Sequence, residues 1–408
     1  MRCRFCATPL EDVFIDLGSA PPSNAFLTAD RLNAPETWFP LKLYTCGKCR
    51  LVQVDELQSH AALFAPDYVY YSSFSRSWLS HAERYVGDAV AKLGLNHNSL
   101  VMEIASNDGY LLQYVAARDI PCIGIEPTSG TANAARQKGI ETLERFFSRE
   151  FAGEFVRERR AADLIVANNV LAHVPDINDF VAGLAVALAE QGTITVEFPH
   201  LMELVGKRQF DTIYHEHFSY FSFHTVQQIF AAHGLRVWDV ERLLTHGGSL
   251  RVWAAHECNH QRTETPEVGM LLALENTAGM RDAAYYQGFQ AQADTVKNDC
   301  LAFLLKQRRA GCKVAGYGAA AKGNTLLNYA GVKSDLLPYV VDASPHKQGR
   351  WLPGSRIPVV DEYRLRADRP DFVLILPWNL RDEIMQQLSY IREWGGKFVV
   401  AVPSLAVL

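Results

Sequence analysis

Long apolar runs are missing from this 408-residue sequence. A helix that crosses a membrane needs about 20 consecutive apolar residues, and no uninterrupted stretch approaches that length. The first residues run directly into a cysteine motif, so nothing there resembles the apolar core of a secretory signal peptide. We therefore expect a cytoplasmic protein that has no membrane partner.

A strong excess of charge of either sign is missing too. The formal net charge is -5 at pH 7 and the isoelectric point is near 6.2, so nothing favours binding to nucleic acid. Hydrophobic residues make up 48% and charged residues 21%, as is usual for a globular protein. Because 408 residues exceed one ordinary core, we expect two or three domains.

The eight cysteines fall into two groups of four. The members of the first group form paired CxxC motifs near the N-terminus, and they are Cys3, Cys6, Cys46 and Cys49. Each CxxC turn can present two sulfurs to one ion, which suits a closed tetrahedral zinc site. A redox pair is the alternative. We predict structural zinc in a small N-terminal module, and we regard the four scattered cysteines as inert apolar residues.

Short apolar strands alternate with helices over residues 75–255. The predicted strands are 99–104, 121–126, 163–167, 192–197 and 249–255, and the predicted helices are 77–93, 129–138, 180–188 and 224–233. A helical connection follows at 265–310, and then further strands at 314–318, 337–342, 371–376 and 397–402. The alternation predicts an α/β protein with two doubly wound, Rossmann-like sheets in tandem.

A turn of small residues, EIASNDGYLL at 103–112, ends the first strand of the first sheet. It lacks the GxGxxG pattern, and its two carboxylates would repel a pyrophosphate but could accept hydrogen bonds from a cationic amino acid. Glu126 closes the next strand, where a carboxylate can accept both hydroxyls of an adenosine ribose. The pattern favours S-adenosylmethionine over a dinucleotide. The predicted donor-site residues are Glu103, Ala105, Asn107, Asp108, Gly109, Glu126 and Asn168.

The segment YHEHFSYFS at residues 214–222 combines two histidines, a glutamate and two tyrosines. Imidazole takes up and releases protons near neutral pH, and a neighbouring carboxylate can fix its tautomer. A metal site made of His215, Glu216 and His217 is the alternative, but residues one and two apart rarely converge on one ion. Acid–base chemistry is therefore favoured. A further histidine, His173, is expected at the same sheet edge.

A second turn, GYGAAAKGNT at 316–325, follows the first strand of the C-terminal sheet. Small residues at a helix start leave backbone N–H groups available to a phosphate, and Lys322 adds a positive charge. Asp342 closes the next strand, as an acidic residue does in NAD-binding folds. A dinucleotide site, a phosphate contact and a purely structural turn all remain open on this pattern.

Taken together, the paired CxxC motifs, ASNDGYLL, YHEHFSYFS and GYGAAAKGN resemble the nucleotide-sugar C-methyltransferases, a group that includes the TDP-sugar C-3'-methyltransferases. The resemblance spans essentially the whole chain. It implies a zinc-binding domain at 1–72, a central class I methyltransferase domain at 73–262 and a Rossmann-like domain at 263–408 that helps to hold the nucleotide-sugar. The implied substrate is a TDP-linked 4-keto-deoxysugar, methylated at position 3. The oligomeric state is left open, with a monomer among the options.

The resemblance also implies catalytic roles. His217 is expected to remove the proton beside the ketone, while Tyr214 and Glu216 orient this base or bind the sugar, and His173 faces the same pocket. Carbon methylation needs such a base because the carbon becomes nucleophilic only as an enolate, and a positioned base contributes about 10²–10⁴-fold in rate. Oxygen and nitrogen acceptors already carry lone pairs.

Substrate contacts are implied in two further places. The sequence YVYYSS at 68–73 resembles an element that brings a tyrosine near the sugar, and Tyr70 and Tyr71 are both candidates. Lys322 and Asn324 are expected at the diphosphate. The competing hypotheses are an O- or N-methyltransferase of small metabolites, an NAD-dependent oxidoreductase and a zinc-knuckle interaction module.

Overall fold

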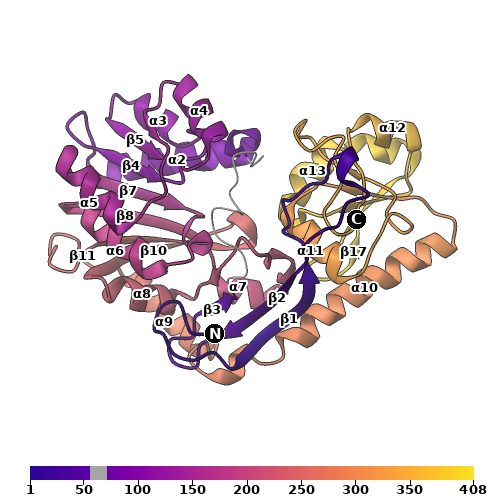
Figure 1. Ribbon diagram of the computed structural model, residues 1–408, viewed down its shortest axis with the longest axis horizontal. Coiled ribbons are helices and arrows are strands. Elements are labelled where there is room, and N and C mark those ends of the chain that lie inside the picture. The colour runs from indigo at the N-terminus through magenta and orange to yellow at the C-terminus, as the bar shows by residue number, and fades with distance from the viewer. Residues whose placement is uncertain (56–70) are drawn as a thin grey trace.

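Three β-sheets organise the computed structural model, which describes residues 1–55 and 71–408 (Figure 1). They are a four-stranded sheet in the order β1-β2-β3-β9, a seven-stranded sheet in the order β10-β11-β8-β7-β4-β5-β6 and a six-stranded sheet in the order β14-β13-β12-β15-β16-β17. The two α/β sheets predicted from the sequence are both present. The smaller sheet is an addition that the sequence pattern does not reveal.

The four-stranded sheet joins the N-terminal module to the middle of the chain. Its strands β1 (Asp12–Ala20), β2 (Phe39–Thr45) and β3 (Val52–Val54) are antiparallel, and β3 also pairs with β9 (Ser219–Tyr220). Because β9 lies inside the 214–222 segment, the backbone of that segment is fixed by the N-terminal module.

The central sheet is parallel through its first five strands and ends in an antiparallel hairpin. The parallel strands are β4 (Val101–Ile104), β5 (Cys122–Ile125), β6 (Thr142–Leu143), β7 (Ala162–Asn168) and β8 (Leu188–Pro199). The hairpin consists of β10 (Leu235–Leu243) and β11 (Ser249–His256). The pattern-based prediction misses β6, which is two residues long, and β10, whose apolar run is interrupted by charged residues.

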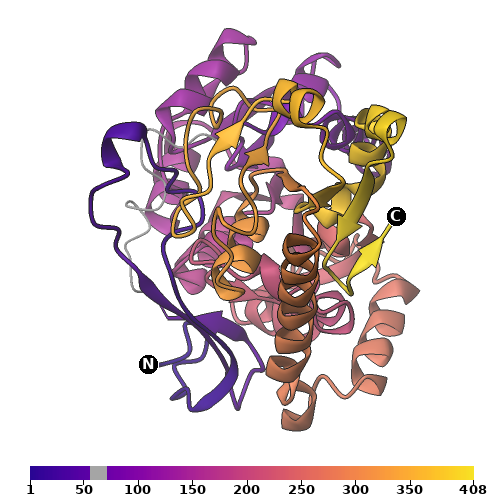
Figure 2. The same ribbon diagram turned by 90° about the vertical axis from the view of Figure 1, so that its right-hand side faces the viewer.

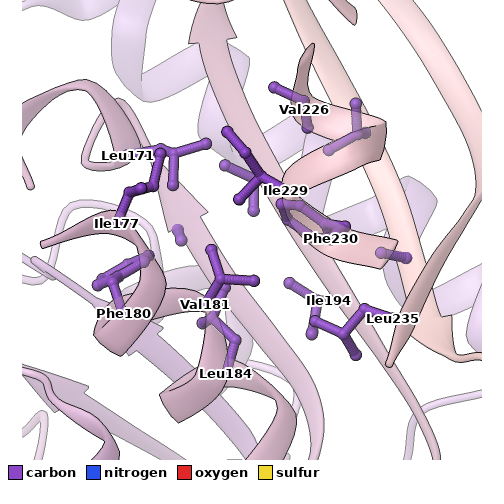
Figure 3. Close-up of a cluster of buried hydrophobic side chains, with 14 of the residues drawn as sticks. Leu171, Ile177, Phe180, Val181, Leu184, Ile194, Val226, Ile229, Phe230 and Leu235 are labelled. Atoms are coloured by element: carbon purple, nitrogen blue, oxygen red, sulfur yellow. The ribbon is translucent and has the colours of Figure 1, made fainter. Parts of the chain in front are cut away.

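Helices cover both faces of the central sheet because its strands alternate their side chains between two hydrophobic clusters. On β7, Leu164 and Val166 belong to one cluster and Ile165 and Ala167 to the other. The first face is covered by α2 (Arg76–Leu93), α3 (Leu112–Ala116) and α4 (Ser129–Gln137). The second is covered by α5 (Arg149–Glu158), α6 (Ile177–Ala187) and α8 (Phe223–Ala231), and Figure 3 shows side chains of α6 and α8 meeting around Ile194.

The C-terminal sheet follows two connecting helices, α9 (Pro266–Thr277) and α10 (Phe289–Arg309). Its strands are β12 (Val314–Tyr317), β13 (Val340–Val341), β14 (Val359–Val360), β15 (Phe372–Ile375), β16 (Lys397–Val400) and β17 (Ala406–Val407). All pairings are parallel except that of β16 with β17. The flanking helices are α11 (Ala321–Tyr329), α12 (Tyr363–Asp368) and α13 (Arg381–Gln387). Four of the six strands match predicted ones, although β13 is shorter than expected.

The N-terminal strands also pack against the C-terminal part of the chain. The rings of Phe14 on β1 and Phe289 on α10 stack with centroids 4.9 Å apart. In Figure 2, where the C-terminal sheet faces the viewer, α10 extends from that sheet toward the level of the N-terminal strands. One hydrophobic cluster therefore holds residues of both the four-stranded sheet and the C-terminal sheet, including Leu43, Tyr220 and Val340. Among the described helices, none is both long enough and apolar enough to span a membrane.

Candidate functional site

The four N-terminal cysteines converge on one point. Their sulfur atoms all lie within 4.8 Å of one another, with the Cys3–Cys49 pair at 3.6 Å and the Cys6–Cys46 pair at 3.5 Å. A tetrahedral zinc ion with Zn–S bonds of about 2.3 Å sets its sulfurs about 3.8 Å apart, so the cluster fits zinc closely. With four protein ligands the site has no open position, as expected of structural zinc.

The zinc module is connected to the 214–222 segment by a short chain of hydrogen bonds. The Gln53 side chain donates to Cys3 Sγ at 3.3 Å, and the Gln53 backbone pairs with Ser219. Val54 N donates to Phe218 O at 3.1 Å, and Phe218 N donates to Ala172 O at 2.7 Å. A zinc-ligand sulfur is therefore linked, through β3, to the residue that follows His217.

The predicted donor turn has an unusual backbone. Ala105, Asn107 and Gly109 all have left-handed φ angles, of 55°, 51° and 74°. Such a conformation costs a non-glycine residue about 1–3 kcal/mol and persists only where the surroundings impose it. Here the surroundings do so: Asn107 N donates to the Glu126 carboxylate at 3.0 Å, and the Asn107 side chain accepts from Ser72 N at 2.9 Å. The turn is thus held in this conformation by hydrogen bonds from its own surroundings.

Several buried polar atoms beside this turn have no hydrogen-bond partner among the described residues. They are both carboxylate oxygens of Glu103, Oδ1 of Asp108 and both side-chain atoms of Asn168. Burial raises the pKa of the Glu103 carboxyl well above its usual range, and the nearby Tyr110 hydroxyl offsets only part of the effect. Buried polar groups are normally paired, so this cluster fits a ligand that brings an ammonium group and further donors.

The predicted donor residues share one edge of the sheet. They follow or close β4, β5 and β7, whose carboxyl ends lie side by side. Glu126 accepts from the Asn107 and Thr128 backbones at 3.0 and 2.9 Å, and a carboxylate has lone pairs left for two ribose hydroxyls. The chemistry of these residues is therefore compatible with S-adenosylmethionine.

His217 is held in a defined tautomer. Its Nδ1 lies 3.0 Å from the Thr212 carbonyl oxygen, which can only accept, so the proton is on Nδ1. Nε2 is then the unprotonated nitrogen, and it accepts a hydrogen bond from the Tyr214 hydroxyl at 2.8 Å. The two rings lie with centroids 4.0 Å apart. His217 thus presents a lone pair at Nε2, as a general base requires.

The surroundings of His217 also favour its neutral form. Burial lowers its pKa well below the usual histidine range, and the neighbouring His173, with His246 and Lys322, acts in the same direction. The rings of His173 and His217 meet edge to face with centroids 4.7 Å apart, and His173 Nδ1 donates to the Glu216 backbone oxygen at 2.8 Å. His173 and His217, distant in sequence, are therefore brought together.

The side chains of Glu216 and His215, the other two titratable groups beside His217, bind partners away from its ring. Both carboxylate oxygens of Glu216 accept from the Asn24 side chain at 2.8 Å. His215 Nε2 donates to the Pro40 oxygen at 3.2 Å, and its ring packs edge-on against Phe39. The three side chains do not converge on a metal position, and the cysteine cluster is the single such group found in residues 1–55 and 71–408. Asn24 could not be identified from sequence because its contact is made only in the folded chain.

Of the two candidate tyrosines, Tyr70 lies outside the described residues. Tyr71 lies next to the donor turn, since the following residue, Ser72, donates to Asn107. Its ring also stacks on His346, in the turn between β13 and β14, with centroids 5.5 Å apart. Tyr71 therefore lies between the donor site and the C-terminal domain.

The glycines of the C-terminal turn are used for close packing. A Cβ atom on Gly318, which has φ of 88°, would lie 2.4 Å from Pro377, and one on Gly323 would lie 2.7 Å from Leu376. The Asp342 carboxylate accepts from Ala319 N of the same turn at 2.7 Å. Strand–helix packing thus accounts for the features that suggested a dinucleotide site.

Lys322 lies close to the 214–222 segment. Its ammonium donates to Asn379 Oδ1 at 2.6 Å and lies 5.0 Å from the centre of the Trp378 ring. Trp378 in turn donates to Asp211 at 2.7 Å, and burial raises the pKa of Asp211 to about 6. Asn324 is buried, with its amide 3.4 Å from the Ser23 oxygen. No sequence motif marks Trp378 or Asp211.

Comparisons with known proteins extend these observations. Three family models match the chain in order: a zinc binding domain at residues 3–64, a methyltransferase domain at 78–240 and a C-methyltransferase C-terminal domain at 244–403. The chain is 34% identical over 410 residues to the C-methyltransferase NovU of Streptomyces niveus, covering all of this chain and 96% of NovU.

Solved structures resemble the chain more weakly. The magnesium protoporphyrin IX methyltransferase of Synechocystis, solved with S-adenosylmethionine bound, is 13% identical and covers 50% of this chain and 100% of its own, with a TM-score of 0.37. An S-adenosylmethionine-dependent methyltransferase of Anabaena variabilis is also 13% identical and covers 50% of this chain and 99% of its own, with a TM-score of 0.39. Structural similarities with such low TM-scores give no information about the activity of this chain.

Proposed function

The chain belongs to the S-adenosylmethionine-dependent C-methyltransferases, and from this premise we propose that it methylates a carbon beside the ketone of a nucleotide-linked 4-keto-deoxysugar. The proposed substrate is TDP-linked, and the proposed site of methylation is position 3 of the sugar, as the resemblance of the motifs implies. The proposed chemistry has two stages, proton removal followed by methylation of the carbon.

The observation that carries the proposal is the tautomer of His217. Its Nδ1–H donates to the Thr212 oxygen, so Nε2 offers a lone pair, and burial keeps the pKa of the ring well below its usual range. Nε2 takes the proton from the carbon beside the ketone, and the C–H electron pair moves to form the enolate, with negative charge on oxygen. An oxygen or nitrogen acceptor would not need this base.

Tyr214 is proposed to orient the base. Its hydroxyl donates to Nε2 at 2.8 Å, the nitrogen that is proposed to receive the substrate proton. Substrate binding would displace this hydroxyl, which could then bind the sugar. Glu216 is proposed to act indirectly, because its carboxylate is held by Asn24 while its backbone oxygen accepts from His173.

When bound, S-adenosylmethionine would supply an electrophilic methyl group for the enolate carbon. Glu103 and Asp108 would bind the cationic amino-acid end, and Glu126 would bind the ribose hydroxyls. The proposed donor-site residues on the strand ends would fix the position of S-adenosylmethionine relative to the base, and alignment of this kind can supply about 7–11 kcal/mol of the barrier.

The three predicted domains would divide the work. Residues 1–72 would carry the zinc and fix the catalytic segment, residues 73–262 would bind the donor and supply the base, and residues 263–408 would help to hold the nucleotide-sugar. Tyr71, with Tyr70, is proposed to face the sugar. Lys322 and Asn324 are proposed to serve the anionic part of the substrate.

Proton exchange tests the proposal directly. A TDP-4-keto-deoxysugar is incubated in deuterated water with enzyme and S-adenosylhomocysteine, and loss of the proton beside the ketone is followed by NMR. We expect the wild-type enzyme to exchange this proton well above the rate without enzyme. We expect His217→Asn to lose about 10²–10⁴-fold in exchange and in methylation, while binding of S-adenosylhomocysteine survives.

The control is His260→Gln, a substitution of an exposed histidine outside the site, which should leave both rates unchanged. Full activity of His217→Asn would refute the base assignment. If the wild-type enzyme neither exchanges nor methylates any member of a panel of nucleotide-linked keto-sugars, judged by a gained methyl mass, the substrate class is wrong. Methylation of an oxygen or nitrogen acceptor without exchange would favour the rival methyltransferase hypothesis.

A further inference from the structure

A histidine with a left-handed backbone lies in the turn between β10 and β11. His246 has φ of 53° and ψ of 21°, inside the short 3₁₀ turn Thr245–Gly247. A histidine in this conformation costs about 1–3 kcal/mol relative to an ordinary one. Strain of this kind is retained where the surroundings fix the residue, and it is frequent at functional sites.

The surroundings of this turn fix it from three sides. The Thr245 hydroxyl donates to Glu197 at 2.8 Å, and the Gln209 amide donates to the Gly247 oxygen at 2.9 Å. From the C-terminal domain, the Trp378 ring lies so close that a Cβ atom on Gly247 would be 2.5 Å away from it. The central and C-terminal parts of the chain therefore cooperate to hold His246 in place.

Glu197 anchors the turn from within the sheet. It is fully buried on β8 and is bound by Arg251 at 3.0 Å and by His81 at 2.8 Å. Its backbone oxygen also accepts from Asn169 N at 2.7 Å. The same residue therefore fixes both the turn that carries His246 and the strand end that carries Asn169.

The imidazole of His246 reaches the edge of the sheet where the donor is expected. The Asn169 amide nitrogen donates to Nε2 at 3.2 Å, so in this arrangement the ring proton is on Nδ1. None of the described residues accepts a hydrogen bond from that Nδ1. Asn169 directly follows Asn168, whose own side chain is buried without a partner in the described chain. One ring nitrogen is thus bonded to Asn169 at the edge of the sheet where S-adenosylmethionine is expected, and the other carries an N–H that is available to a ligand.

His246 is also close enough to the base to influence it. Its charge, like that of Lys322, would lower the pKa of His217. Burial, with the Lys322 ammonium nearby, lowers the pKa of His246 to about 4, so the ring is neutral at pH 7. A neutral imidazole can donate a hydrogen bond without giving up its proton.

We propose that His246 is a catalytic residue that donates a hydrogen bond from Nδ1 to the ketone oxygen as this oxygen becomes the enolate oxygen. The inference rests on the proposed carbon-acid chemistry. His217 receives the proton from carbon, the electron pair shifts onto the ketone oxygen, and His246 keeps its own proton while stabilising that charge. After the methyl group is accepted by the carbon, the ketone is restored and the hydrogen bond weakens. Lys322 supplies a positive field at the same place.

Two substitutions distinguish the roles of the two ring nitrogens of His246. In His246→Asn the side-chain amide lies near the position of Nδ1, and asparagine accepts the left-handed backbone. In His246→Gln the amide reaches the position of Nε2 and so can keep the contact with Asn169 but not the N–H of Nδ1. His256→Gln, on the neighbouring strand β11 and bonded to the Leu188 oxygen at 3.3 Å, is the matched control.

The readouts are proton exchange of a TDP-4-keto-deoxysugar with S-adenosylhomocysteine bound, methylation under saturating donor, and the dissociation constant of S-adenosylhomocysteine by calorimetry. Loss of one oxyanion donor typically costs about 10²–10³-fold in rate. We expect that loss in His246→Gln for both exchange and methylation, a loss below about 10-fold in His246→Asn, and no change in His256→Gln.

The outcomes are distinguishable. If His246→Gln keeps wild-type exchange, or if its defect is confined to weaker binding of S-adenosylhomocysteine, the catalytic role is wrong. As a second test, His246→Gly suits the backbone, and added imidazole should restore exchange in it. Retained cofactor binding without such rescue would also overturn the proposal. Absence of exchange in the wild-type enzyme would instead refute the proposed function.

Discussion

Glu103→Gln should change cofactor affinity and stability in opposite directions. Glu103 is 1% exposed on β4, and both of its carboxylate oxygens lack a partner among the described residues. The fold therefore buries this carboxyl group without pairing it within the described chain, and we propose that it binds the ammonium group of S-adenosylmethionine. Glutamine has the same shape but cannot carry the negative charge that an ammonium group would pair with.

The expected loss of affinity follows from the contact that is removed. A hydrogen bond to a charged group contributes about 1.5–3 kcal/mol, and every 1.4 kcal/mol changes an equilibrium constant tenfold. S-adenosylmethionine should therefore bind Glu103→Gln about 10- to 150-fold more weakly. Isothermal titration calorimetry with S-adenosylmethionine and S-adenosylhomocysteine measures this change.

The stability of the ligand-free protein should rise in the same variant. Burial raises the pKa of Glu103 in the folded state, so above the unfolded-state pKa of about 4.3 folding must either desolvate the charge or take up a proton. This cost grows as the pH rises from about 4.3 through the folded-state pKa, and it disappears in glutamine. A gain of about 1–2 kcal/mol would raise the midpoint of thermal unfolding by about 2–4 °C per kcal/mol.

Glu126→Gln is the matched control. The Glu126 carboxylate accepts from two backbone N–H groups at 2.9 and 3.0 Å, so this variant should lose stability as well as affinity. Scanning calorimetry of the ligand-free proteins at pH 7 compares the two. Unchanged affinity in Glu103→Gln, or a ligand-free protein less stable than the wild type, would refute the reasoning about Glu103.

Three further predictions concern the base, the zinc and the C-terminal turn. Because the pKa of His217 is lowered, the rate of proton exchange should stay at its plateau at pH 6.5 and fall only as the pH drops through the folded-state pKa. His173→Asn removes one influence that lowers this pKa, so the acid limb of the pH profile should move to higher pH. A limb that moves to lower pH would contradict the electrostatic account. Gln53→Leu removes the hydrogen bond to a zinc-ligand sulfur and should weaken zinc binding by about 10–100-fold. Competition with a chelator measures this affinity. Unchanged zinc affinity would mean that the hydrogen bond is dispensable. Gly318→Ala should destabilise the protein by more than about 2 kcal/mol, because the new Cβ would lie 2.4 Å from a proline ring. Gly349 has a similar φ but open space around it, so Gly349→Ala should lower the free energy of unfolding by less. Equal losses in the two variants would show that backbone strain alone matters.

Local patterns predicted most of the two α/β sheets. The strands β4, β5 and β7 are short, mostly apolar runs that are almost entirely buried, and such runs are visible in the sequence. The pattern-based prediction failed where a strand owes its existence to its partner. β9 is two residues long and becomes a strand only by pairing with β3, which lies more than 160 residues earlier in the chain.

The candidate site likewise contains residues that could be grouped from the sequence and residues that could not. The sequence could predict that Glu103, Glu126 and Asn168 lie near one another, because the carboxyl ends of parallel strands meet at one edge of the sheet. The partner of Glu216 could not be predicted, because Asn24 reaches it from the N-terminal module. The position of Lys322 beside Trp378 likewise depends on how the C-terminal domain packs on the rest of the chain.

The sequence by itself determined the chemistry available to this protein: four thiols for zinc, carboxylates at the strand ends and an imidazole-rich segment. These depend on residue type and on spacing along the chain, which act locally. Only the tertiary structure decided the state of each imidazole, because the tautomer of His217 is set by the Thr212 oxygen and its pKa is lowered by burial and by the neighbouring His173. Burial and the distances between remote residues arise only when the three sheets pack together, so no local pattern can encode them.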